Sequence, residues 1–186
     1  MSEKRGLFLK HFFKNVKTTG SVTPSSRFLV AKLCNMGDFE HARYVVELGP
    51  GTGVFTQEIL SRVSDATRVI AIESNEDFVH RLNERFDDVR LTVIHGDAAM
   101  IKDIVSGHWQ DEVDIVLSSL PLTVIPEPAK SRIMNGSFEV LRKGGEYLQY
   151  QYSMNAANKL KTLYGNLQVK REPRNVPPAR CFRCVK

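Results

Sequence analysis

The sequence predicts an α/β fold in which a mainly parallel sheet of seven strands is completed by a C-terminal antiparallel hairpin. Short apolar runs alternate with longer segments of helical periodicity, which is the pattern of βαβ units. A glycine-rich turn directly follows the first apolar run, as in open sheets that bind a ligand at their carboxyl edge. The 186 residues, 42% of them hydrophobic, suit one compact core.

Five strands are predicted first, because each is a short run rich in Val, Ile and Leu. Their ranges are Arg43 to Leu48, Arg68 to Ile72, Arg90 to Ile94, Val113 to Leu117 and Glu146 to Tyr152. Nearly continuous apolar runs are typical of parallel strands covered by helices on both faces. We therefore expect four crossover segments between these five strands.

Helical periodicity and capping residues place the helices between and after these strands. The predicted helices are Thr52 to Val63, Asn75 to Phe86 with Asn75 as its cap, Glu127 to Leu141 ended by Gly144 and Gly145, and Met154 to Tyr164. Two further strands, Leu167 to Arg171 and Arg180 to Val185, flank a connection that contains Pro173, Pro177 and Pro178. They predict the closing hairpin.

Composition narrows the possible partners and location. Lys and Arg total 26 against 21 Asp and Glu, and the net charge of +5 favours anionic partners such as membranes or nucleic acid. The cysteines Cys34, Cys181 and Cys184 make no disulfide framework, and we expect no metal site because the last two lack a second ligand pair. No apolar run approaches the roughly 20 residues of a membrane span, and the N-terminus does not resemble a signal peptide. We expect a cytoplasmic protein.

The ends of the first three strands carry acidic residues around a glycine-rich turn. Glu47 precedes Gly49-Pro-Gly51-Thr-Gly53, Glu73 ends the second strand, and Asp97 follows the third. Carboxylates in these positions can accept hydrogen bonds from ribose hydroxyls and an adenine amine. Each residue taken alone could serve a tight turn or cap a helix. Capping alone does not require acidic residues at three adjacent strand ends, so we expect a nucleotide-type cofactor.

The G-x-G-x-G spacing differs from the G-x-G-x-x-G of dinucleotide-binding proteins, which leaves a dehydrogenase as the distant alternative. The set resembles the class I methyltransferase motifs over most of Tyr44 to Tyr152. This resemblance implies a single Rossmann-like domain, S-adenosylmethionine as cofactor and S-adenosylhomocysteine as product. It implies that Glu47 lies beneath the methionine moiety. The implied cofactor-binding residues are Glu47, Gly49, Gly51, Gly53, Glu73, Ser74, Asp97, Ala98 and Ser118.

The segment Ser118-Ser119-Leu120-Pro121-Leu122, at the end of the fourth strand, is where amino methyltransferases receive the target nitrogen. Adenine N6 dimethylases typically carry an Asn or Asp there, then two residues and an aromatic that stacks on the base. Here Ser118 or Ser119 and Leu122 replace them. The segment is similar to that of the bacterial phospholipid N-methyltransferases, which methylate phosphatidylethanolamine toward phosphatidylcholine. The general outline also resembles the rRNA adenine dimethylases, so RNA or protein methylation is the second reading.

Segments near both ends of the chain also resemble the phospholipid N-methyltransferases. Gly20-Ser-Val-Thr-Pro-Ser25-Ser26-Arg27 is similar to a Gly-x-Val-x-Pro-Ser-Ser segment of the phospholipid enzymes, and Pro177-Pro178-Ala179 matches their Pro-Pro-Ala. The candidate catalytic residues are Tyr150, Ser118, Leu120 and Pro121, with Tyr152 and His95 as further candidates to line the amine pocket. Ser25, Ser26 and Arg27 are expected to contact substrate or membrane.

Residues 4 to 17 predict an amphipathic helix. One face carries Phe8, Leu9, Phe12, Phe13 and Val16, and the other carries Lys10, Lys14 and Lys17. Such a helix can lie on an anionic bilayer, pack on the domain as an ordinary cover, or present its lysines to RNA. We expect an N-terminal unit of helix and lid segment over 1–36, and a methyltransferase domain over 37–186. The expected partners are an anionic membrane surface, on the inner face of which the protein is peripheral, and a phospholipid substrate. No stable nucleic-acid partner is expected, and the oligomeric state stays open.

Overall fold

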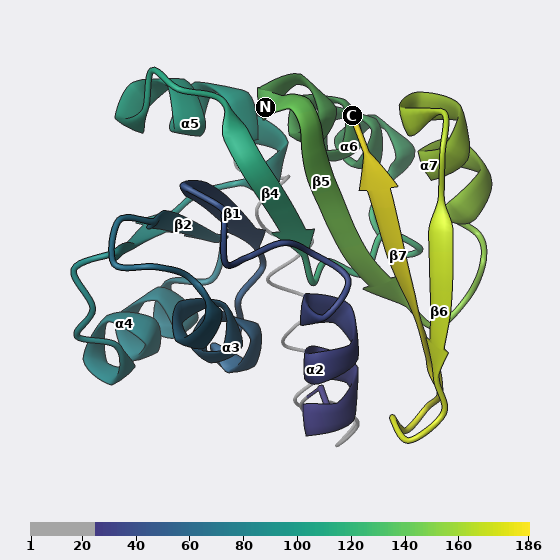
Figure 1. Ribbon diagram of the computed structural model, residues 1–186, viewed down its shortest axis with the longest axis horizontal. Helices are drawn as coiled ribbons and strands as arrows, with labels where there is room; N and C mark the ends of the chain where they lie inside the picture. Colours follow the sequence, from purple (N-terminus) through teal and green to yellow (C-terminus); the bar gives the residue numbers. More distant parts are fainter. Residues whose placement is uncertain (1–24) are drawn as a thin grey trace.

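Seven strands form one sheet in the order β3-β2-β1-β4-β5-β7-β6 (Figure 1). The computed structural model describes residues 25–186. The strands are β1 Tyr44–Leu48, β2 Arg68–Glu73, β3 Leu91–His95, β4 Val113–Ser118, β5 Leu141–Gln151, β6 Gln168–Glu172 and β7 Ala179–Val185. The helices are α2 Arg27–Cys34, α3 Val54–Arg62, α4 Glu76–Arg85, the short 3-10 helix η1 Ala98–Met100, α5 Ile101–His108, α6 Glu127–Val140 and α7 Ala157–Tyr164.

Strand pairing confirms the predicted fold class. The first five strands pair in parallel, while β7 runs antiparallel to both β5 and β6 and so forms the predicted hairpin. β1 lies between β2 and β4. From β1 the chain passes to β2 and β3 on one side of it, and then crosses to β4 and β5 on the other side. Open α/β sheets bind ligands at the carboxyl ends of the strands beside such a switch point. The glycine-rich turn after β1 lies at that place.

Each face of the sheet is covered by its own helices. One hydrophobic cluster joins Val46 and Leu48 to residues of α5, α6 and α7, and the other joins Val45 to residues of α2 and α3. Alternate residues of β1 therefore point to opposite faces. Cys34, Cys181 and Cys184 are free thiols within these cores, and burial raises their pKa values, which keeps them protonated and unreactive.

Helix α2 was not predicted, and it lies in the segment 1–36 that we assigned to the N-terminal unit. Its N-cap is Ser26, whose hydroxyl accepts from the Leu29 amide at 3.2 Å. The side chains of Leu29, Val30, Leu33 and Cys34 are buried against α3, β5 and β7. The division of the chain at residue 36 stays a prediction. The predicted helix over 4–17, with Phe8, Phe12, Phe13, Lys10 and Lys14, lies outside the described residues.

The predicted role of Gly144 and Gly145 is wrong. α6 ends at Val140 and the chain enters β5 at once, so both glycines lie inside the strand. Their backbones bond the last residue of the chain: the Gly144 amide donates to the Lys186 carbonyl at 2.8 Å, and the Lys186 amide donates to the Gly145 carbonyl at 2.9 Å. Gly144 has a φ of 78°, which suits the local irregularity between β4 and β5. The two glycines therefore serve a strand bend.

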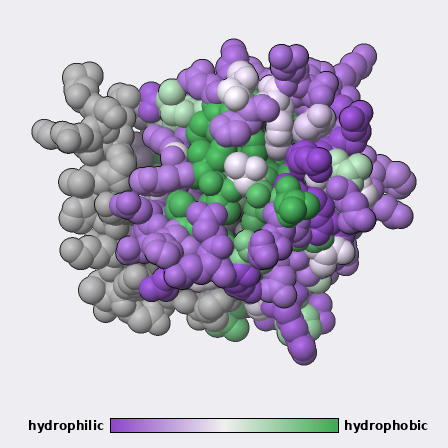
Figure 2. All heavy atoms as spheres, turned by 90° about the vertical axis from the view of Figure 1, so that its left-hand side faces the viewer, coloured by the Kyte–Doolittle hydropathy of each residue, from purple (hydrophilic) through white to green (hydrophobic). Residues whose placement is uncertain are grey.

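β3 and β6 are the two edge strands of the sheet, and β3 lies at the edge farthest from the C-terminal hairpin. Figure 2 looks at this side of the molecule and shows apolar side chains gathered in the middle of a largely polar face. Leu91, Val93 and Ile94 of β3 are only partly buried, as expected for an edge strand that helices cover incompletely. Within residues 25–186, no helix is long and apolar enough to cross a membrane.

Candidate active site

The three glycines of the turn after β1 all have positive φ values, and they differ in what surrounds them. A side chain at Gly49 would meet Leu120 at 2.6 Å, and one at Gly53 would meet the Phe86 ring at 2.6 Å. These two glycines are explained by close packing. Gly51, at φ 55°, has no side chain or other backbone from residues 25–186 within 4 Å of the position a Cβ would take, apart from its chain neighbours. The turn therefore presents open space at Gly51, where a ligand can approach the backbone closely.

Glu73 is tied to this turn. Its carboxylate accepts from the Gly51 amide at 3.0 Å and from the Asn75 amide at 2.9 Å. Burial raises the pKa of Glu73, and the backbone donors oppose that effect. Asn75 caps α4 as predicted, because its side chain accepts from the Asp77 and Phe78 amides. Glu73 therefore does not cap that helix, and its carboxylate is held beside the open space at Gly51.

Glu47 is fully buried on the face of the sheet that α3 covers. One of its oxygens accepts from the Thr56 hydroxyl at 2.6 Å, and the other has no hydrogen-bond partner within the described part of the chain. Burial raises the pKa of Glu47 to about 8. A buried carboxyl oxygen without a partner and the open space at Gly51 both fit a polar cofactor that lies across the end of β1 and hydrogen-bonds this oxygen. The residues present thus fit S-adenosylmethionine.

The raised pKa of Glu47 predicts how stability without cofactor depends on pH. The folded pKa of about 8 lies above the ordinary 4.5, so between these values the folded state binds more protons than the unfolded state. The free energy of unfolding should therefore fall as pH rises from 5 to 8, by up to about 1.4 kcal/mol per pH unit. Glu47→Gln, which keeps the acceptor for Thr56, should flatten this dependence. Urea unfolding at pH 5, 6.5 and 8 measures both proteins, and equal slopes would contradict the assignment.

The end of β3 supplies the third acidic position. Asp97 caps η1, because its Oδ1 accepts from the Ala99 amide at 2.9 Å. Ala98 is buried in the core, and the His95 imidazole lies 3.2 Å from the Ser74 carbonyl. Since Glu73 and His95 are register partners, Asp97 follows the strand end next to Glu73. The structure therefore brings the predicted cofactor-binding residues of β1, β2 and β3 to one edge of the sheet.

The loop after β4, residues 119–122, is fixed by a network that the sequence analysis missed. The Gln149 and Gln151 amides both donate to the Leu120 carbonyl, at 2.9 and 3.0 Å. The Tyr147 hydroxyl donates to the Gln149 side chain at 2.7 Å, and all three donors are buried. The available signal was the alternation of Tyr147, Gln149 and Gln151 along the strand, which places all three on one face. We call Tyr147, Gln149 and Gln151 the acceptor-loop clamp.

The two serines of the loop differ in orientation. Ser118, the last residue of β4, turns its hydroxyl into the core, where it accepts from the Leu120 amide at 3.4 Å and bonds Tyr147. Ser119 donates its backbone amide to the Leu48 carbonyl, and its buried hydroxyl has no hydrogen-bond partner within residues 25–186. The free hydroxyl of this loop therefore belongs to Ser119, while Leu120 is buried beside Gly49 and Pro121 is half-buried.

Tyr150 lies on the other face of the sheet from the Ser118 side chain, so the structure does not bring these two candidate groups together. Its ring stacks on Phe55 with centroids 5.7 Å apart and meets Tyr152 edge-on at 6.0 Å. Its hydroxyl accepts from the Ser25 hydroxyl at 3.3 Å. Burial raises the pKa of Tyr150, so the phenol is neutral and does not act as a ready base.

The two segments that resemble the phospholipid N-methyltransferases, around Ser26 and around Pro177, lie in contact. The Ser26 amide donates to the Asn175 side chain at 3.0 Å, and the Asn175 side chain donates to the Pro177 carbonyl at 2.8 Å. Beside them, the guanidinium groups of Arg27 and Arg174 lie 4.9 and 4.1 Å from the centroid of the Phe28 ring. The start of α2 and the β6–β7 turn thus meet beside Tyr150.

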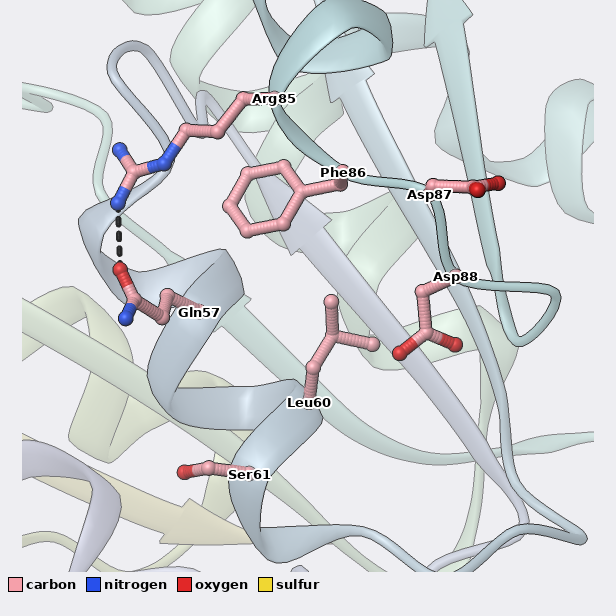
Figure 3. A pocket seen from close by; sticks show the side chains of 7 residues that line it. All are labelled: Gln57, Leu60, Ser61, Arg85, Phe86, Asp87 and Asp88. Atoms are coloured by element: carbon pink, nitrogen blue, oxygen red, sulfur yellow. Dashed lines mark hydrogen bonds between the residues drawn. The ribbon is translucent and has the colours of Figure 1, made fainter.

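A separate hollow lies between α3 and the C-terminal end of α4 (Figure 3). It is lined by Gln57, Leu60, Ser61, Arg85, Phe86, Asp87 and Asp88, and Gln57 and Arg85 are hydrogen-bonded across it. None of the predicted site residues lines it. The Phe86 ring separates it from the glycine turn, because that ring packs against Gly53.

Comparison with known proteins agrees with this geometry. The family described as "Methyltransferase domain" matches residues 45–145. An ornithine lipid N-methyltransferase of Singulisphaera acidiphila is 32% identical over 96% of this chain and 94% of its own length. A probable ribosomal RNA small subunit methyltransferase A of Methanospirillum hungatei is 31% identical, but over 60% of this chain and 40% of that protein. The crystal structure of precorrin-6y C5,15-methyltransferase from Geobacter metallireducens shares the fold at a TM-score of 0.71 and 12% identity, covering 89% and 92% of the two chains. The chain therefore belongs to the methyltransferase domain family, as an enzyme that transfers methyl groups from S-adenosylmethionine to nitrogen.

Proposed function

We propose that the protein methylates the amine of a membrane lipid such as phosphatidylethanolamine, at the surface of the membrane. The observation that carries this proposal is the loop after β4, which lacks both contacts that grip an adenine. No Asn or Asp stands at Ser118 or Ser119, and Leu122, in the place of the stacking aromatic, is 1% exposed. A flat base has no platform there, whereas a small alkyl amine needs none.

Two further observations support a lipid acceptor. A relative that spans 96% of the chain is named for an ornithine lipid, while the ribosomal RNA methyltransferases that also match cover less of it, from 52% to 81%. The predicted amphipathic helix over 4–17, with three Phe on one face and Lys residues on the other, suits an anionic bilayer. We therefore place the protein in the cytoplasm, peripheral on the inner face of the membrane.

In the reaction, the chain holds the cofactor, orients the acceptor amine toward it, and excludes water from both. S-adenosylmethionine, when bound, supplies an electrophilic methyl group on a positively charged sulfur. Glu47, the Gly51 backbone, Glu73 and Asp97 would hold it. The Ser119 hydroxyl and the backbone of its loop offer polar partners for the acceptor amine, which must be neutral to react. Because no described side chain of the loop is a base, we expect catalysis by positioning and by exclusion of water.

The test is transfer of labelled methyl from S-adenosylmethionine to lipid or to RNA. Mixed anionic liposomes would carry phosphatidylethanolamine or an ornithine lipid in separate arms, and an adenine-containing RNA would be the parallel acceptor. We expect label in at least one lipid arm. Label in RNA alone would reject the proposal and favour the rRNA-type relatives, which the basic net charge also suits.

A further inference from the structure

We propose that the loops around the mouth of the acceptor site dock directly on an anionic lipid bilayer. We call this surface the acceptor-side rim and define it by the exposed residues Val124, Tyr152, Met154, Val176, Arg27 and Arg174. The inference rests on the proposed lipid substrate, and it adds which face of the folded domain meets the membrane. It is independent of the predicted helix over 4–17.

The rim residues gather at the carboxyl edge of the sheet although they come from separate loops. Val124 follows β4, and Tyr152 and Met154 follow β5. Gln151 is the register partner of Arg180, and Glu172 is the partner of Ala179, so the β6–β7 turn that carries Val176 lies at the same edge. In Figure 1 this is the lower edge, where the arrowheads of β4, β5 and β6 and the helix α2 lie. The loop over 119–122 opens at that edge too.

Exposure of apolar side chains is concentrated here. Within the described part of the chain, seven large apolar residues are exposed, and five of them follow the carboxyl ends of strands or lie in the β6–β7 turn. Val124, Tyr152, Met154 and Val176 are 42%, 48%, 45% and 76% exposed. Single exposed apolar residues are ordinary, but a group around the mouth of a site marks a contact surface. Because they stand on separate loops, they suit shallow insertion into a bilayer interface, where a Tyr is also favoured.

The charge of the same loops matches an anionic surface. Segments 25–28, 119–126, 152–158 and 173–180 contain Arg27, Arg174 and Arg180 but no Asp or Glu, although the chain has 21 acidic residues. The two carboxylates that directly adjoin these segments are both paired with basic residues. Glu172 is buried and bonds Arg174 and Lys32, and the exposed Glu127 bonds Lys130 and Lys159. Basic residues beside exposed apolar ones are attracted to anionic lipid headgroups. A polyanion such as RNA would use the arginines but not the apolar side chains.

The test compares two matched double variants of the full chain. Val124→Ser with Val176→Ser removes apolar surface from the rim. Val89→Ser with Val169→Ser makes the same change at the other end of the strands, where the valines are 98% and 38% exposed. Sedimentation is measured with vesicles of phosphatidylglycerol and phosphatidylcholine, and with phosphatidylcholine alone. Neither lipid carries a primary or secondary amine, so binding is measured apart from methyl transfer, and the proposed function is tested separately on detergent-dispersed aminolipids.

We expect the rim variant to bind the anionic vesicles at least about tenfold more weakly than the wild type, and the control variant to stay within about twofold. Both should keep the wild-type affinity for S-adenosylmethionine. Arg27→Gln should also weaken vesicle binding, while Arg81→Gln on the exposed side of α4 should not. The proposal is overturned if the rim variant sediments like the wild type. It is also overturned if neutral vesicles bind as tightly as anionic ones, or if the valine changes are silent while Arg27→Gln weakens RNA and vesicle binding alike.

Discussion

Gly51→Ala is expected to weaken binding of S-adenosylmethionine about 10- to 100-fold while the protein still folds. Among the described residues, a Cβ at this position meets no atom within 4 Å beyond its chain neighbours, so the added methyl group would occupy the space we assign to the cofactor. Overpacking of that size costs about 1–3 kcal/mol, and about 1.4 kcal/mol is a tenfold change in affinity. The positive φ of 55° adds a folding cost of about 1–2 kcal/mol, which does not depend on the cofactor. Calorimetric titration with the cofactor and thermal unfolding without it measure the two effects separately.

Gly53→Ala is the matched control for this prediction. Its added methyl group would meet the Phe86 and Leu82 side chains at 2.6 and 2.8 Å, at a φ of 80°. We therefore expect Gly53→Ala to lose more folding stability than Gly51→Ala. For each kcal/mol of stability lost, it should lose less affinity for the cofactor. If Gly51→Ala binds the cofactor within about threefold of the wild type, the open space at Gly51 is not where the cofactor lies.

The local pattern of the sequence was enough for most of the fold. Runs rich in Val, Ile and Leu locate β1 to β4 to within a residue or two, because strands covered on both faces, as β1, β2 and β4 are, must be largely apolar. Long-range pairing explains the errors. Gly144 and Gly145 have the form of a helix stop, but the last residue of the chain pairs with them, and no local pattern shows that. α2 was missed because it has only eight residues and its buried face is defined by α3, β5 and β7, which are remote in the sequence.

The part of the site in which the chemistry requires a particular residue type could be predicted from the sequence. The part that depends on the direction in which a side chain points could be predicted less well. The acidic residues at the ends of three strands could be identified from their spacing, because those ends must meet at one edge. Which of Ser118 and Ser119 points into the core depends on where β4 ends, since side chains alternate. Gln149 and Gln151 alternate with tyrosines and resemble one polar strand face. Only the cover of α6 and α7 over that face makes them buried donors to Leu120.

Loss of one donor from the acceptor-loop clamp should lower kcat strongly and leave cofactor binding nearly unchanged. Gln151→Leu removes one of the two amides on the Leu120 carbonyl, while the Gln149 amide keeps that carbonyl paired. The stability cost should therefore be modest, about 1 kcal/mol. The Leu120 peptide lies between Ser119 and Pro121, so its displacement moves the groups that face the acceptor amine. A misplacement of about 1 Å can cost about 100-fold in rate, and we expect a loss of about 10- to 100-fold in kcat.

Three comparisons separate positioning from general damage. Gln151→Glu keeps the size of the side chain but sets an acceptor against the carbonyl, so its kcat should fall at least as far as that of Gln151→Leu. Gln149→Leu also deprives the Tyr147 hydroxyl of its acceptor and should cost more stability. Gln168→Leu, on the exposed edge strand β6, is the matched surface control and should change neither kcat nor stability. If Gln151→Leu raises KM for S-adenosylmethionine in parallel with the loss of kcat, the clamp supports the cofactor side of the site as well, and a role confined to the acceptor loop is refuted.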